Sequence, residues 1–234
     1  MSLGGGMRNG GAVLLDFDHT LFDTDRFFWI DIRAAFNQFG IDGRRWEESY
    51  ARLWPDGYSL EKHLDYLTRQ GQVTVSVKTA IQQVLRASFA DLRSYLFTDV
   101  EPFLSRLQAA KIPCFLLSFG DASWQEYKVH GAGLAHFFED VFYTPKVQAK
   151  VEVVEKVVGR FGRIAVVDND PRELDLIKAR HPEIETFWIT RVPRDALESV
   201  DSETRERFRE ARAYATLLAE FPHHRCHTLS EVTL

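Results

Sequence analysis

Short apolar runs alternate with helically spaced segments through much of the chain, and this alternation restricts the fold more than any other feature. The sequence predicts helices at 102–110, 122–130, 151–159 and 172–180, and strands at 113–117, 141–143, 164–167 and 186–189. Strands that are joined by helices lie parallel in one sheet, and the helices pack on its two faces. The predicted class is therefore α/β, with a Rossmann-like parallel sheet at its core.

A helical segment interrupts this alternation after the first strand. That strand is predicted at 12–17, and helical spacing follows at 28–40, 46–53, 60–68 and 77–92, without a convincing buried strand between them. We therefore expect a core domain of residues 12–23 and 98–234 that carries a helical cap domain at 24–97. The core is predicted to end in a charged helix at 202–218 and a last strand at 225–228. Residues 1–11 are glycine-rich and are expected to be a disordered N-terminus or a tag.

Charge and cysteine usage narrow the range of functions. The net charge is -5 and Lys and Arg form no dense run, which argues against nucleic-acid binding. The longest apolar runs are much shorter than a membrane span, so no membrane partner is expected. Cys114 and Cys226 show no zinc-binding spacing and are expected to be reduced thiols in a cytoplasmic protein. We expect a monomer or homodimer whose partner is a small-molecule substrate.

Polar side chains close three of the predicted strands. Asp16 and Asp18 close the first strand, Ser118 follows the second and Asp168 follows the fourth. Ligands of an open parallel sheet bind at the carboxyl ends of its strands, so these side chains are expected to meet. Two aspartates spaced two residues apart on an extended segment lean to the same side, and Asp168 would repel both unless a cation lay among them. Hard oxygen ligands select Mg²⁺, so a magnesium site is predicted.

The Asp-x-Asp-x-Thr pattern is weak when it is taken alone. Asp16 and Asp18 have a simpler interpretation as turn or helix-capping residues after a strand. The position of the pattern at a strand end, together with Ser118 and Asp168, favours a functional site.

The same residues carry a resemblance to a known family. The segment from Leu15 to Phe22, the strand end at Ser118, a lysine before a helix, and the segment from Val166 to Arg172 occur in this order along the chain. In this respect the sequence resembles the haloacid dehalogenase-like (HAD) hydrolase superfamily. The helical insert is similar to the superfamily's C1-type cap. The resemblance implies a HAD-like core with an inserted helical cap domain.

The resemblance also implies a role for each motif residue. Asp16 would attack phosphorus as the nucleophile, while Asp18 would protonate the leaving oxygen and then activate water. The carboxylates of Asp16 and Asp168 and the backbone carbonyl of Asp18 would bind Mg²⁺. Ser118 would hold a phosphoryl oxygen, and Thr20 would fix the first loop.

The lysine of the third motif has two candidates. Lys146 and Lys150 both precede the predicted helix at 151–159. We favour Lys150 because it lies at the helix start, where the helix dipole also favours an anion. Lys146, Thr20 and Phe119 are further candidates for substrate contact.

Several neighbouring residues have open roles. Asn169, Asp170 and Glu173 are alternatives for supporting the metal shell, and Asp170 is equally suited to cap the following helix. His19 is next to Asp18 on an extended chain, so it is expected to point away from the catalytic carboxylates and to be structural.

Aromatic residues are concentrated in the predicted cap and include Phe27, Phe28, Trp29, Trp46, Trp54, Tyr58 and Tyr66. These rings either line a substrate pocket between cap and core or pack the interior of a small helical domain. We expect the cap to be mobile and to set substrate choice without taking part in phosphoryl transfer.

The sequence thus predicts a hydrolase of phosphomonoesters, namely a Mg²⁺-dependent phosphatase that acts on a small phosphorylated metabolite through an aspartyl-phosphate. Asp18 argues against a dehalogenase, which has no alcohol to protonate. A phosphomutase would keep the same residues, and a catalytically idle binding or regulatory module would keep the fold.

Overall fold

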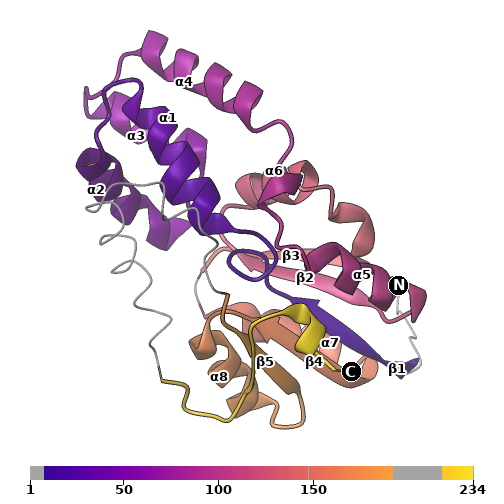
Figure 1. Ribbon diagram of the computed structural model, residues 1–234. Helices are drawn as coiled ribbons and strands as arrows, with labels where there is room; N and C mark the ends of the chain where they lie inside the picture. The colour runs from indigo at the N-terminus through magenta and orange to yellow at the C-terminus, as the bar shows by residue number, and fades with distance from the viewer. Residues whose placement is uncertain (1–7, 147, 192–217, 234) are drawn as a thin grey trace, which may run out of the picture.

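The computed structural model describes residues 8–146, 148–191 and 218–233, and its centre is a parallel sheet (Figure 1). Within these residues the sheet has six strands in the order β3-β2-β1-β4-β5-β6, and every neighbouring pair is parallel. The strands are β1 Arg8–Leu15, β2 Cys114–Phe119, β3 Asp140–Thr144, β4 Phe161–Asp168, β5 Glu185–Ile189 and β6 His224–Cys226. The predicted α/β class with a parallel sheet is confirmed.

Helices cover both faces of the sheet. Alternate residues of the central strands belong to two separate hydrophobic cores, which explains why these strands are almost continuously apolar. One core is closed by α7 Lys150–Val158 and α8 Pro171–Arg180. The other includes α5 Val100–Ala109 and α6 Ala122–Gly131 and continues into the helices inserted after β1.

Strand β1 begins earlier than the sequence predicts. Residues 8–11, which were expected to be disordered, belong to β1, where Arg8 pairs with Phe161 of β4 and Gly11 pairs with Arg163. This part of the prediction is wrong because strand pairing depends on backbone hydrogen bonds, which extend past the last apolar side chain. The expectation for residues 1–7 lies outside the described part of the chain.

Between β1 and α5 the chain forms a helical lobe (Figure 1). Its helices are the π-helix η1 Asp25–Ile32, α1 Arg33–Asn37, α2 Gly43–Leu53, the 3-10 turn η2 Trp54–Asp56, α3 Leu60–Arg69, α4 Val75–Ser88 and the 3-10 turn η3 Arg93–Tyr95. The side chains of Asp42, Ser59 and Thr74 each accept a backbone N–H hydrogen bond and so begin α2, α3 and α4. The lobe occupies the range predicted for the cap, and its behaviour as a separate domain stays a prediction.

Aromatic rings fill the interior of the helical lobe. Phe36 and Trp46 are fully buried there. His63 is buried beside them, with its Nε2 2.5 Å from Ser49 Oγ and its Nδ1 3.2 Å from the Tyr58 hydroxyl. Burial lowers the pKa of His63 to about 3, so the imidazole is neutral at physiological pH.

Two chain segments connect the lobe to the sheet, and Arg191 fastens both. Phe22 in the first segment forms an isolated bridge with Leu96 in the second. The Arg191 guanidinium donates to the carbonyl of Thr20 at 2.7 and 3.0 Å and to Asp99 Oδ2 at 2.7 Å. One buried cation therefore fixes the loop that follows β1 and the return of the chain into α5.

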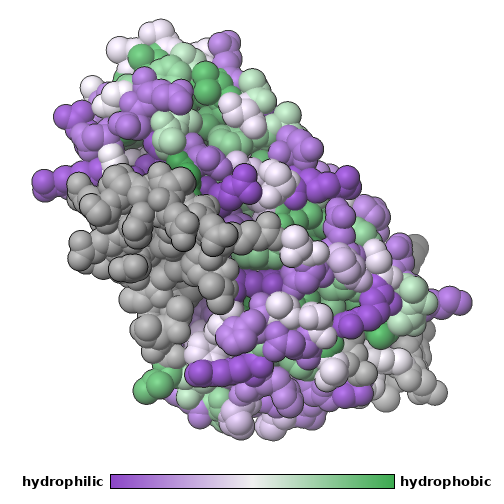
Figure 2. Space-filling view, viewed as in Figure 1, coloured by the Kyte–Doolittle hydropathy of each residue, from purple (hydrophilic) through white to green (hydrophobic). Residues whose placement is uncertain are grey.

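Hydrophilic and hydrophobic residues are mixed over the helical lobe and the sheet core on the face shown in Figure 2. In the described part of the chain, no helix combines the length and the apolar character that a membrane crossing requires. The helix predicted at 202–218 falls almost wholly on residues 192–217, outside the described residues. The last predicted strand is present as β6.

Candidate active site

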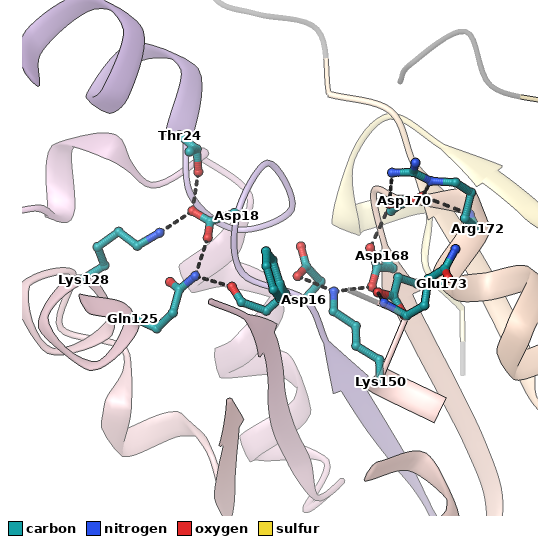
Figure 3. Close-up of polar contacts among 12 residues, drawn as sticks. Asp16, Asp18, Thr24, Gln125, Lys128, Lys150, Asp168, Asp170, Arg172 and Glu173 are labelled. Carbon is teal, nitrogen blue, oxygen red and sulfur yellow. Dashed lines mark hydrogen bonds and ion pairs between the residues drawn. The ribbon is translucent and has the colours of Figure 1, made fainter. Parts of the chain in front are cut away.

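Asp16, Asp18, Lys150 and Asp168 lie together at the carboxyl ends of β1 and β4 (Figure 3). With Ser118 at the end of β2 they line a cavity of about 410 Å³, and residues of the helical lobe line it from the other side. Asp16 directly follows β1, Ser118 is the penultimate residue of β2, and Asp168 ends β4. All three side chains are buried. The parallel topology therefore brings together residues that are far apart in the sequence.

Lys150 connects two of the acids. Its Nζ donates to Asp16 Oδ1 at 2.7 Å and to Asp168 Oδ2 at 2.6 Å, and all three groups are buried. Lys150 is the first residue of α7, as predicted. Lys146 is exposed and does not line the cavity; its contact to a substrate stays a prediction.

The charges around Lys150 are unbalanced. Burial lowers the pKa of Lys150, but the carboxylates of Asp16 and Asp168 outweigh burial and raise it above its usual value. Burial raises the pKa of Asp168 well above its usual value; Lys150 opposes this shift, while Asp16 and Glu173 add to it. One lysine thus faces three acids, an arrangement that favours the binding of a further cation.

A second buried lysine holds Asp18 (Figure 3). Lys128 Nζ lies 2.5 Å from Asp18 Oδ1, and Thr24 Oγ1 donates to the same oxygen at 2.6 Å. Gln125 Nε2 donates to Asp18 Oδ2 at 2.8 Å. Burial alone would raise the pKa of Asp18, but Lys128 and these hydrogen bonds bring it below its usual value. Asp18 is therefore held as a carboxylate, whereas protonation of a leaving group requires the acid form.

Lys128 and Gln125 line the candidate site and contact Asp18, and sequence reasoning missed them. They lie three residues apart on α6, so they share one helix face, and α6 begins four residues after Ser118. This spacing was the available signal. The spacing does not by itself indicate burial, because a lysine on a helix is usually a surface residue.

Ser118 and Phe119, the last two residues of β2, line the cavity. Ser118 Oγ is buried and has no hydrogen-bond partner among the described residues. A buried hydroxyl on the cavity wall is suited to bind an oxygen of a ligand. The Phe119 ring lines the cavity, and its carbonyl accepts from Gln125 Nε2 at 2.5 Å.

Asp170 serves mainly to begin α8. Its carboxylate accepts from the Arg172 backbone N–H at 2.9 Å and pairs with the Arg172 guanidinium at 2.7 Å. Its own backbone N–H donates to Asp168 Oδ1 at 2.8 Å and so orients that acid. Of the two interpretations left open for Asp170, helix capping is the one that the structure shows.

Asn169 and Glu173 lie closer to the other acids. With its amide nitrogen turned towards β1, Asn169 donates to Asp16 Oδ2 at 3.3 Å and to the Asp18 carbonyl at 3.1 Å, so these two oxygens face one point. Glu173 Oε1 accepts from the Gln148 N–H at 2.6 Å, and Oε2 is buried without a partner in the described chain. Burial raises the pKa of Glu173.

These oxygens suit Mg²⁺. In the described ranges no three His, Cys, Asp or Glu side chains are grouped closely enough to hold a metal on their own; Lys150 stands between Asp16 and Asp168. Mg²⁺ needs only one or two carboxylates, because water and substrate phosphate complete its shell. Asp16, Asp168 and the Asp18 carbonyl provide such a donor set, and Glu173 is a further acid that lines the same cavity.

Thr20 and His19 lie in the loop after β1. Thr20 is fully buried and does not line the cavity, and its carbonyl accepts from Arg191, which agrees with the predicted role in fixing the loop. A substrate contact by Thr20 stays a prediction. His19 does line the cavity, with its Nδ1 3.4 Å from Asp25 Oδ2. The chain leaves the extended conformation at His19, where φ is 61°, so the alternation of an extended strand does not hold there.

Aromatic side chains form much of the remaining cavity wall. From the helical lobe they are Phe28, Trp29, Tyr50, Trp54 and Tyr58; from the core they are Phe119 and Trp124. The predicted aromatic residues Phe27, Trp46 and Tyr66 are not part of the lining. The predicted set therefore divides between the cavity wall and the interior of the lobe.

Comparison with known families gives one match over most of the chain. A family model described as haloacid dehalogenase-like hydrolase matches residues 11–179. No curated protein matches the chain in sequence. The matched range contains Asp16, Asp18, Ser118, Lys150 and Asp168.

Several solved structures have a similar fold. A candidate haloacid dehalogenase-like hydrolase from Burkholderia xenovorans LB400 is 18% identical with a TM-score of 0.71, over 97% of this chain and 100% of that chain. An L-2-haloacid dehalogenase from Xanthobacter autotrophicus with chloropropionic acid covalently bound is 18% identical with a TM-score of 0.61, over 96% of each chain. The HAD-hydrolase YfnB from Bacillus subtilis, bound to magnesium, is 14% identical with a TM-score of 0.51, over 96% of this chain and 97% of that chain. At these identities the likeness shows the fold alone.

Proposed function

The chain belongs to the haloacid dehalogenase-like hydrolase family, and within that family we propose that it is a Mg²⁺-dependent phosphatase acting on a small phosphomonoester. The observation that carries the proposal is Asp18, which lines the same cavity as Asp16 two residues away. The alcohol of a phosphomonoester leaves as an alkoxide that needs a proton, whereas a halide leaves as a stable anion. A second acid at this position therefore has a use in phosphoryl transfer and none in dehalogenation.

In the proposed first step, Asp16 attacks phosphorus, the bond from phosphorus to the leaving oxygen breaks, and an aspartyl-phosphate forms on Asp16. Lys150 contacts Asp16 and offsets the negative charge that gathers there. Ser118 Oγ donates to a phosphoryl oxygen, a role that suits its unpaired, buried hydroxyl. A bound Mg²⁺ would supply screening of the charges on the nucleophile and the phosphate.

Asp18 moves the protons in both steps. It gives a proton to the leaving oxygen in the first step; in the second it takes a proton from the water that attacks the phosphorus of the aspartyl-phosphate, which frees Asp16 and inorganic phosphate. Lys128 and Gln125 hold its carboxylate in place and favour the base form. Asp18 must therefore gain a proton as substrate binds before it can serve the first step.

The proposal is tested by phosphate release from p-nitrophenyl phosphate, measured beside chloride release from 2-chloropropionate. We expect Mg²⁺-dependent phosphate release and no chloride release. Asp16→Asn should lower phosphate release by at least about a thousandfold with an unchanged circular dichroism spectrum, because an amide does not attack phosphorus. Asp140→Asn, which changes an exposed aspartate at the start of β3, is the matched control. Chloride release by the wild type, or wild-type-like hydrolysis by Asp16→Asn, would contradict the proposal.

A further inference from the structure

Rings from the helical lobe and from the core meet at the cavity. The ring centroids of Trp54 and Phe119 lie 5.8 Å apart, and those of Tyr58 and Trp124 also lie 5.8 Å apart. Phe119 directly follows Ser118, whose hydroxyl is the proposed contact to the phosphoryl group. A group that is bonded to a phosphoryl oxygen at Ser118 would therefore extend among aromatic side chains.

Trp54 has ring surface that the protein leaves uncovered. The residue is 41% exposed, although it lines the cavity. The turn that carries it is packed tightly on the core: Gly57 has a φ of 78°, and a Cβ there would lie 2.8 Å from the Asp121 nitrogen. Lys62, at the start of α3, also pairs with Asp121 at 2.8 Å. The Trp54 ring is thus held at the cavity with an apolar surface that a planar ligand could cover.

The charges of the cavity disfavour a second anionic group on the ligand. Within the described residues, each Lys and Arg that lines the cavity already contacts an aspartate: Lys128, Lys150 and Arg172. Asp25 and Glu173 are further acids in the lining. A second phosphate or a carboxylate would therefore meet acids without a cation to receive it.

We propose that the leaving group of the substrate is an uncharged aromatic alcohol whose ring packs against Trp54, Phe119 and Tyr58. This inference rests on the proposed phosphatase activity. The aromatic wall favours a flat apolar group, because offset or edge contacts between rings add to the burial of area. Phosphorylated sugars and phosphorylated acids are expected to be poorer substrates, since they offer hydroxyls or charge where the wall offers rings.

Binding of phosphonates tests the inference without catalysis, because their carbon–phosphorus bond is not hydrolysed by this chemistry. Isothermal titration of the wild-type protein with Mg²⁺ would compare benzylphosphonate, cyclohexylmethylphosphonate and 4-carboxybenzylphosphonate. We expect benzylphosphonate to bind about fivefold more tightly than the cyclohexyl compound. We expect the added carboxylate to weaken binding by about tenfold.

Variants of the wall sharpen the test. Trp54→Ala should weaken benzylphosphonate binding by about tenfold and abolish its advantage over the cyclohexyl compound, while Trp54→Phe should keep most of that advantage. Tyr66→Ala is the matched control, because this half-buried ring of α3 does not line the cavity. Equal binding of the two neutral phosphonates by the wild type would overturn the inference, and so would an unchanged preference in Trp54→Ala.

Binding of inorganic phosphate distinguishes a failure of this inference from a failure of the proposed phosphatase activity on which it rests. Binding of inorganic phosphate together with Mg²⁺-dependent phosphate release, but without a preference for the aromatic compound, would overturn the inference and leave the phosphatase in place. Failure to bind inorganic phosphate and every phosphonate would overturn both.

Discussion

The carboxyl ends of the strands and the interior of the helical lobe are both buried, yet different groups fill them. At the strand ends, Lys150 and Lys128 lie against carboxylates. Inside the lobe, His63 lies among aromatic rings and is kept neutral by burial. A buried charge is tolerated only beside a partner, whereas a buried ring needs only close packing. The strand ends are therefore suited to catalysis, whereas the packed interior of the lobe fixes the lobe's shape.

This difference predicts two kinds of response to change. Loss of a charge or a counter-ion at the strand ends should remove activity while much of the fold survives. A change inside the lobe should alter stability and leave the chemistry in place.

Removal of metal should have the largest effect on the charged region. We expect excess chelator to lower hydrolysis of p-nitrophenyl phosphate by at least about a thousandfold, because three acids would then face the phosphate with Lys150 alone. Added Mg²⁺ should restore the rate, and excess Ca²⁺ should inhibit it, since calcium takes more oxygen ligands at longer distances. Undiminished hydrolysis in chelator would remove the metal role given to Asp16 and Asp168.

Substitution of Lys150 should cause the next largest loss of activity. Lys150→Met leaves Asp16 and Asp168 buried without their shared cation, and we expect the rate to fall by about a hundredfold or more. Lys146→Met is the matched control, because Lys146 is exposed and outside the cavity lining. Steady-state rates of the two variants, compared at saturating Mg²⁺, check this expectation. Equal losses in both variants would show that the choice of Lys150 is wrong.

The neutral histidine of the lobe should affect stability and its dependence on pH. The pKa of His63 is about 3 in the folded protein and 6.5 ordinarily, so the unfolded chain binds an extra proton between these values. Stability is therefore lost as the pH falls through this window, by about 1.4 kcal/mol for each pH unit. His63→Leu should flatten this dependence, even though it breaks the contacts to Ser49 and Tyr58.

Urea midpoints at pH 7 and pH 5 for the wild type and His63→Leu measure that dependence. Other titratable groups change the stability of both proteins between pH 7 and pH 5. The difference between the two proteins in this change therefore isolates the contribution of His63. An identical loss of stability from pH 7 to pH 5 in both proteins would mean that His63 is not kept neutral by the fold.

The two regions also differ in how far the sequence predicts them. The strand ends are predicted well, because apolar runs that stop at Asp16, Ser118 and Asp168 fix both the strands and the edge where they meet. Lys150 could be favoured because a helix start is a recognisable position. The sequence supports Lys128 less well: its spacing from Gln125 indicates a shared helix face, but its burial depends on how α6 packs on the loop after β1, which is a tertiary contact.

In the lobe, the sequence predicts helices but not the use of each ring. The spacing of Phe28, Trp46 and Trp54 is compatible with either packing or cavity lining, and only the fold decides between them. The loop after β1 is a similar case. His19 lines the cavity and Thr20 does not, because the chain turns at His19, and no periodic pattern in the sequence predicts such a turn.

The central claim is a covalent phosphoryl group on Asp16, and an acid-quenched reaction tests it most directly. A phosphomonoester labelled with ³²P is mixed with the protein and Mg²⁺, quenched in acid during the first turnover, and digested. The account predicts a labelled peptide containing Asp16 whose label is released by hydroxylamine, as expected for an acyl phosphate, and its absence from Asp16→Asn or from samples in chelator. Rapid Mg²⁺-dependent phosphate release with no label on Asp16 at any quench time would contradict the account.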